Sequence, residues 1–96
     1  MEIKEFYVNK TLFKAISFDL CDSSQLLMIT SPKGYIMCGY LNINTAQKRG
    51  DVACIVTGVK TIDDVLNSKI VALTSNAQKL GIEMNMPVKS VLEKLS

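Results

Sequence analysis

Cys38 stands in the segment Gly34-Tyr35-Ile36-Met37-Cys38-Gly39, where an apolar strand runs into a glycine. A thiol at a strand end that faces a helix N-terminus can be held as a reactive thiolate. However, the chain contains no histidine to take the proton from such a thiol. Cys38 is therefore either a nucleophile that works without histidine or a small buried residue of a strand. Gly39 either shapes the turn or lets another backbone approach closely.

A second segment with possible chemistry is Gly58-Val59-Lys60-Thr61, in which a strand exit leads into a helix start. Free N–H groups at a helix start and a lysine cation are the parts of a small anion site. The segment is not a Walker phosphate loop, because Val59 separates Gly58 from Lys60 and the earlier glycine is missing. We expect Gly58, Lys60 and Thr61 to bind a small anionic ligand. The alternative is an ordinary strand-to-helix turn with a solvated lysine.

Other catalytic and metal chemistry is poorly represented. The absence of histidine excludes Ser-His and Cys-His pairs and removes the commonest zinc ligand. Cys21, Cys38 and Cys54 lie sixteen or seventeen residues apart and form no Cys-x-x-Cys pair. Asp19 and Asp22 flank Cys21 and could act as a carboxylate pair, but polar residues in a turn need no further reason. We expect no metal site and no cofactor.

Composition limits the size and the partners of the protein. Its 96 residues fit a single domain over 1–96, and 48% of them are hydrophobic. So high an apolar fraction in so short a chain predicts a homo-oligomer, because monomers seldom leave large apolar patches in water. Eleven Lys and Arg against nine Asp and Glu give a net charge of +2 without a basic cluster. A nucleic-acid partner is therefore not expected.

The chain also lacks the signals of export or membrane insertion. Met1 leads directly into charged residues, and no apolar stretch reaches the roughly 20 residues of a membrane span. An odd number of unpaired cysteines suits a reducing compartment. We expect a cytoplasmic protein with no membrane partner.

The first forty residues read as an antiparallel meander. Strands are expected over residues 3–8, 12–20, 25–30 and 35–41. In the second of them Leu12, Ile16, Phe18 and Leu20 share one apolar face, and Phe18 is expected in the core with Phe6 and Phe13. Turns are expected at residues 9–10, 21–24 and 31–34.

The remaining residues alternate helices with short strands. Asn42 or Asn44 would cap a helix that ends at Gly50, Thr61 a helix over 62–67, and Thr74 a helix that stops at Gly81. Strands are expected over 52–56 and, more briefly, over 70–73. The last helix would begin at Pro87 and bury one face, formed by Val88, Val91, Leu92 and Leu95. The predicted class is α+β, with a mainly antiparallel sheet of about four to six strands and helices packed on one side.

Segments 34–39 and 55–66, together with the tail Ala77-x-x-Leu80-Gly81-Ile82, resemble the YunC-like family, domain of unknown function 1805. The resemblance implies a small α+β domain and, since the family has no assigned activity, transfers no catalytic role. Where the family commonly has Gly-Met, this chain has Asn85-Met86, and Asn also adopts left-handed backbone. Cys54 stands where a small residue such as Ala is expected, which favours a packing role.

These features together favour a self-associating module that binds a small anionic ligand or a protein partner through residues 58–61. The alternative is an enzyme that uses Cys38 as its nucleophile, with Lys60 or a helix terminus stabilising charge.

Overall fold

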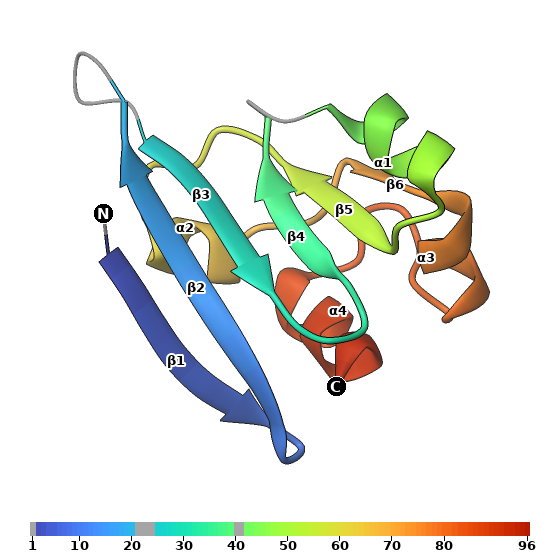
Figure 1. The fold of residues 1–96 in the computed structure, drawn as a ribbon, viewed down its shortest axis with the longest axis horizontal. Helices are drawn as coiled ribbons and strands as arrows, with labels where there is room; N and C mark the ends of the chain where they lie inside the picture. Colours follow the sequence, from blue (N-terminus) through green and yellow to red (C-terminus); the bar gives the residue numbers. More distant parts are fainter. Residues whose placement is uncertain (1, 21–24, 40–41) are drawn as a thin grey trace.

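The computed structural model describes residues 2–20, 25–39 and 42–96. A six-stranded sheet runs across the molecule, and its strands are neighbours in the order in which they follow in the chain (Figure 1). The strands are β1 (Glu2–Val8), β2 (Thr11–Asp19), β3 (Gln25–Thr30), β4 (Tyr35–Cys38), β5 (Ala53–Val56) and β6 (Ala72–Leu73). All neighbouring pairs are antiparallel except β4 and β5, which run parallel. The predicted α+β class with a mainly antiparallel sheet is confirmed.

Tight turns join the first four strands where the structure describes them. Asn9 and Lys10 between β1 and β2 both have positive φ, 49° and 69°. A two-residue turn with positive φ at both positions has the twist that a β-hairpin needs. Asn9 and Lys10 therefore adopt a backbone conformation that glycine usually provides in such turns. Between β3 and β4, the backbone N–H of Ser31 donates to the Gly34 carbonyl at 2.8 Å. The turn expected at 21–24 and the strand end at 40–41 lie outside the described residues.

Four helices follow in the described part of the chain; three of them begin at the predicted caps, and the last begins directly after Pro87. They are α1 (Ile43–Arg49), α2 (Ile62–Leu66), α3 (Ser75–Lys79) and α4 (Val88–Leu95). The side chains of Asn42, Thr61 and Thr74 each accept a backbone N–H of the helix that follows. Gly50 ends α1 with φ 77°, and Asn85 has φ 66°, which confirms its predicted left-handed backbone.

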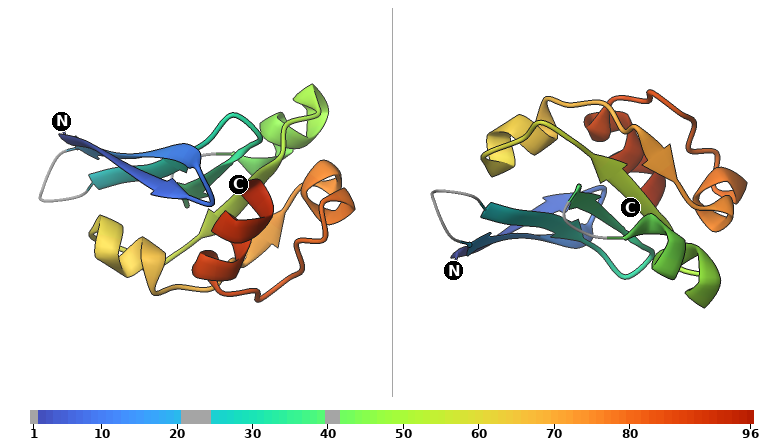
Figure 2. Two further views of the ribbon diagram at one scale, coloured as in Figure 1. Left: turned by 90° about the horizontal axis from the view of Figure 1, so that it is seen from below. Right: turned by 90° about the horizontal axis from the view of Figure 1, so that it is seen from above.

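The main core lies on one face of the sheet, here called the inner face. Helices α2 and α4 lie together on this side of the sheet in both views of Figure 2 and pack against the inner face. The predicted face of α4 is buried, and it meets Phe13, Ile29 and Ile36 from the strands. The inner face therefore carries most of the buried apolar surface.

The opposite face, here called the outer face, carries one helix. Ala46 of α1 packs there against Met37, Ala53 and Ile55 of β4 and β5. The sequence predicted helices on one side of the sheet, whereas α1 lies on the opposite side from α2 and α4 (Figure 2). The helix takes this side because it joins the parallel pair β4 and β5 by a crossover.

The apolar stripe of β2 faces away from the main core, contrary to the expectation for Phe18. Phe13 is fully buried on the inner face and stacks on Phe6 with ring centroids 5.6 Å apart. Side chains alternate along a strand, so Leu12, Ile16 and Phe18 point to the outer face, where Phe18 is 49% exposed. The predicted alternation is present, but the stripe with more apolar residues is the exposed one.

Candidate functional site

Strands β4 and β5 end side by side at one edge of the sheet because they run parallel. The chain leaves β4 towards α1 on the outer face and leaves β5 towards α2 on the inner face (Figure 2). In open sheets with parallel strands, ligands bind where neighbouring connections leave in opposite directions, because that divergence opens a crevice. The ends of β4 and β5 meet this condition.

A hollow of about 290 Å³ lies at this place. Its lining comes from the ends of β4 and β5 and the beginning of β3: Gln25, Cys38, Gly39, Thr57, Gly58 and Val59. Cys38 and Gly58, which the sequence assigned to two separate candidate sites, therefore line the same hollow.

Cys38 forms part of the wall of this hollow and is 4% exposed. Its Sγ accepts a hydrogen bond from the backbone N–H of Leu27 at 3.4 Å. The β3–β4 register ends at the pair Met28 and Met37, so the thiol occupies the place of the next ladder acceptor. Among the described side chains no base is hydrogen-bonded to this sulfur.

Gly58 and Gly39 shape the two strand exits differently. Gly58 has φ 70°, a conformation that favours glycine, and a Cβ added there would meet no atom within 4 Å. A Cβ on Gly39 would stand 3.4 Å from Cγ2 of Thr57, which is ordinary contact. Backbone conformation therefore requires glycine at 58, and a side chain there would project into open space.

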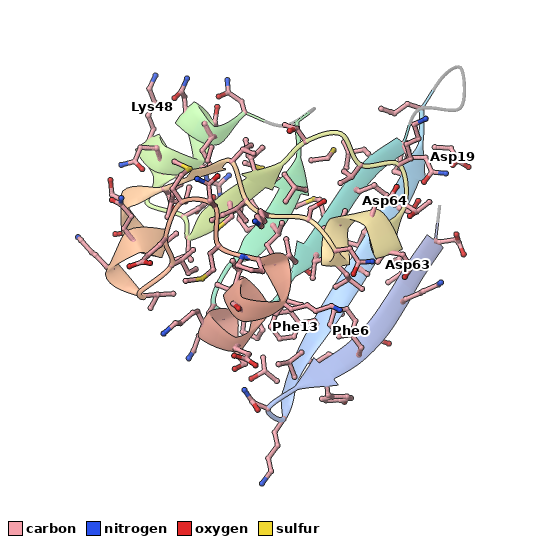
Figure 3. All side chains as sticks on the ribbon, turned by 180° about the vertical axis from the view of Figure 1, so that it is seen from behind. Phe6, Phe13, Asp19, Lys48, Asp63 and Asp64 are labelled. Atoms are coloured by element: carbon pink, nitrogen blue, oxygen red, sulfur yellow. The ribbon has the colours of Figure 1, made fainter. Side chains whose placement is uncertain are left out.

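The start of α2 is already occupied by the chain's own groups. Thr61 Oγ1 accepts the N–H of Asp64 at 3.1 Å, and Asp64 Oδ2 accepts the N–H of Lys60 at 3.0 Å. Asp63 and Asp64 lie at the same end of the molecule as Asp19 (Figure 3). An anion at this helix start would compete with the Asp64 carboxylate and the Thr61 hydroxyl for the same N–H groups.

The structure does not place Lys60 and Thr61 with Cys38 and Gly58. Lys60 is exposed and is absent from the lining of the hollow. Thr61 lines a neighbouring hollow of about 250 Å³ on the inner face, beside Glu2, Lys4 and Asp63. The predicted anion site is thus divided between two places.

Gln25 borders both hollows and was not singled out from the sequence. Its Oε1 accepts from Ser17 Oγ at 2.9 Å, and its Nε2 donates to Asp19 Oδ1 at 3.2 Å. These contacts hold the amide in place between the hollows. The signal in the sequence is a lone polar residue at the start of an otherwise apolar strand.

Cys54 has the opposite character to a reactive thiol, as the packing interpretation predicts. It is fully buried, and burial raises its pKa from 9.0 to about 12. We expect no alkylation of Cys54 by iodoacetamide in the native protein near pH 8, because the thiolate is the reacting form. Labelling of native Cys54 as fast as of the urea-unfolded chain would contradict this.

The raised pKa of Cys54 makes the free energy of unfolding decrease at alkaline pH. The folded pKa is raised, so the contribution of Cys54 is complete below pH 9 and is lost as pH rises towards 12. Cys54→Ala should show a smaller loss of unfolding free energy between about pH 8 and about pH 10 than the natural chain. Urea titrations at both pH values measure the difference, and an equal loss in both proteins would contradict the prediction.

Two further searches cover residues 2–20, 25–39 and 42–96. No three Cys, Asp or Glu side chains there converge in a way that could hold a metal ion. None of the described helices has the length and apolar character to cross a membrane.

Comparison with known proteins places the chain among relatives. The model of the family "Domain of unknown function (DUF1805)" matches residues 37–95. The uncharacterized protein YunC of Bacillus subtilis (strain 168) is 32% identical over 87 residues, which cover 86% of this chain and 85% of YunC. The crystal structure of the protein of unknown function TA1206 from Thermoplasma acidophilum superposes with a TM-score of 0.92 at 40% identity, covering 99% of this chain and 92% of that one. The chain belongs to the DUF1805 family.

Proposed function

We propose that this protein is a self-associating binding module that takes a small polar ligand in the hollow between the ends of β4 and β5. The observation that carries the ligand site is the divergence of the two strand exits around a hollow of about 290 Å³. A water molecule occupies about 30 Å³, so this space suits a ligand the size of roughly ten waters. A small molecule or one end of a larger one fits it.

The lining indicates the kind of ligand. It offers the amide of Gln25, the hydroxyl of Thr57 and the thiol of Cys38, and the lining residues that the structure describes include no carboxylate. Lys60, two residues beyond Gly58, is the cation that would favour an anionic group. Asp64 opposes that preference, because it already accepts the Lys60 N–H. The proposed ligand is therefore a small polar molecule, and Lys60, which stands outside the lining, could meet only an anionic group that extends beyond the hollow.

Thermal shift tests this ligand site directly. Inorganic phosphate, acetate and neutral amides are suitable probes, and a bound probe raises the melting temperature by mass action. Gly58→Ala should abolish the rise, because Gly58 lines the hollow and an added methyl group with a strained backbone would change its wall. Gly50→Ala is the matched control, since Gly50 has a similar φ of 77° but lies outside the hollow. An equal rise in both variants would place the ligand elsewhere, and loss of the rise in Lys60→Ala would show an anion contact.

Self-association is supported by the apolar outer face. Ile3 is 54% exposed there, with Phe18 and Ile16 on the neighbouring strand. Exposed apolar patches of this kind mark contacts between proteins. We expect sedimentation of the natural chain to show a dimer that forms as concentration rises from about 10 μM to about 1 mM.

A matched pair of substitutions tests which surface is involved. Ile3→Glu should shift the association to at least about tenfold higher concentration, because a charge would be buried without a partner. Met84→Glu should leave it unchanged, since Met84 is equally exposed at 53% but lies outside the strands. Equal behaviour of the two variants would exclude the outer face as the contact.

Thiol chemistry at Cys38 is the second candidate function. The observation in its favour is that Cys38 borders the hollow beside a small ligand's expected position. Free thiols of this kind suit a reducing compartment such as the cytoplasm. The rate of iodoacetamide labelling against pH decides the matter in a chain that carries both Cys21→Ser and Cys54→Ala, where Cys38 is the one remaining thiol. Labelling of the native protein near neutral pH supports a nucleophile, whereas labelling only after unfolding leaves Cys38 a wall residue.

A further inference from the structure

The outer face of β1, β2 and β3 has no helix upon it among the described elements. The outer helix, α1, packs on β4 and β5 (Figure 2). Tyr7 on β1 is 70% exposed, and Ile3 and Phe18 are about half exposed. A partner that covers this face must therefore approach over β1 to β3, because α1 blocks the other half.

The strand registers arrange the apolar residues of this face in rows. One row crosses the whole sheet without a polar interruption: Ile3, Ile16, Met28, Met37, Ile55 and Ala72. Tyr7 and Leu12 are cross-strand partners and form a second apolar pair on β1 and β2. An unbroken apolar row is typical of a sheet face that packs against another layer.

The one charged pair on this part of β1 and β2 lies between these apolar pairs. Glu5 and Lys14 are cross-strand partners, with Ile3 and Ile16 on one side and Tyr7 and Leu12 on the other. Each of the three outer-face positions of β1 thus has a partner of compatible character on β2: apolar with apolar, and acid with base. Such a pattern is self-complementary, which is the property that a symmetric interface needs.

We infer that a second copy of this chain packs face to face on β1 and β2, about a two-fold axis that runs along the strands between the two sheets. With this axis above the gap between β1 and β2, each residue of β1 lies over its register partner on β2 of the second copy. Glu5 then lies opposite Lys14 of the second copy, and Ile3 lies opposite Ile16. This inference rests on the proposed self-association and names its surface and symmetry.

The size of the face sets the strength of the dimer. Two strands about 4.8 Å apart and seven residues long, at about 3.4 Å per residue, present roughly 230 Å² per copy. Two copies together therefore bury on the order of 460 Å², which is well below the roughly 1,200 Å² of a stable interface. A weak, reversible dimer that dissociates at about 100 μM or above is expected, and not an obligate one.

Charge reversal in two separate chains tests the opposed pair. Glu5→Lys and Lys14→Glu each place like charges across the two-fold axis, so each variant alone should dimerise at least about tenfold more weakly than the natural chain. An equimolar mixture should regain the natural affinity, because a Glu5→Lys chain paired with a Lys14→Glu chain again has opposite charges at both contacts. Both variants also place like charges on neighbouring strands of their own chain, and mixing cannot relieve that, so recovery reports contact between copies. Sedimentation velocity of each variant and of the mixture supplies the measurement, and melting curves verify that both variants fold.

Each result decides the inference. Recovery in the mixture supports the face-to-face dimer. If the natural chain dimerises but the mixture does not recover, or if the single variants dimerise normally, this surface and axis are wrong while the proposed self-association stands. A natural chain that stays monomeric up to about 1 mM overturns the self-association itself.

Discussion

Gly34→Ala is expected to lower the free energy of unfolding by about 3 kcal/mol or more, since it inserts a methyl group where no space exists. A Cβ on Gly34 would stand 2.7 Å from Cγ1 and 2.8 Å from Cβ of Val52, and it would also meet the Val52 carbonyl oxygen. That carbonyl accepts the N–H of Tyr35 at 3.0 Å, at the point where β4 and β5 begin to run together. The substitution would thus separate the pair of strands that forms the hollow.

The matched control for this substitution is Gly58→Ala. Gly58 has a left-handed backbone but open space around its Cα, so its replacement should cost only about 1–2 kcal/mol. Urea unfolding at equilibrium measures both values. Equal costs for the two variants would mean that β4 and β5 do not approach at Gly34 as described.

Thr74→Val should lower the free energy of unfolding by about 3 kcal/mol although it keeps the shape of the side chain. The Thr74 hydroxyl is buried, accepts from the N–H of Ala53 at 3.2 Å and of Ala77 at 3.3 Å, and donates to the Asp51 carbonyl at 2.8 Å. Valine would leave all three backbone groups without this partner. The hydroxyl therefore caps α3, as predicted, and it also links α3 to the start of β5 through Ala53 and Asp51.

Thr74→Ser separates the hydroxyl from the shape of the side chain. It keeps the three hydrogen bonds and loses one methyl group, so a cost of about 1 kcal/mol is expected. Chemical denaturation of both variants distinguishes the two roles. A serine variant as unstable as the valine variant would show that packing, and not hydrogen bonding, makes Thr74 important.

Local features of the fold were predictable because each depends on residues close in sequence. Asn42, Thr61 and Thr74 cap their helices, and the turn at Asn9 forms, through backbone conformations that these residue types favour. The buried face of α4 followed from helical spacing alone. The strand positions were also predictable, since each strand is a short apolar run between turn signals.

Features that depend on distant residues were not predictable in the same way. The parallel pairing of β4 with β5 requires the crossover through α1, and local pattern does not show which side of the sheet a crossover takes. The face expected for Phe18 is wrong because both faces of β2 are partly apolar. The same parallel pair brings Cys38 and Gly58 to one hollow at the ends of β4 and β5, whereas Thr61 lines the neighbouring hollow.

Amide shift mapping of the 15N-labelled protein against a fragment library of small polar molecules tests the central claim, that ligands bind between the ends of β4 and β5. Binding there should place the largest shifts on Gly39, Thr57, Gly58 and Val59, which line the hollow. These shifts should vanish in Gly58→Ala and persist in Gly50→Ala. Shifts that gather at the hollow beside Thr61 and Asp63, or on the outer face, would contradict it, as would a library that moves none of the four amides.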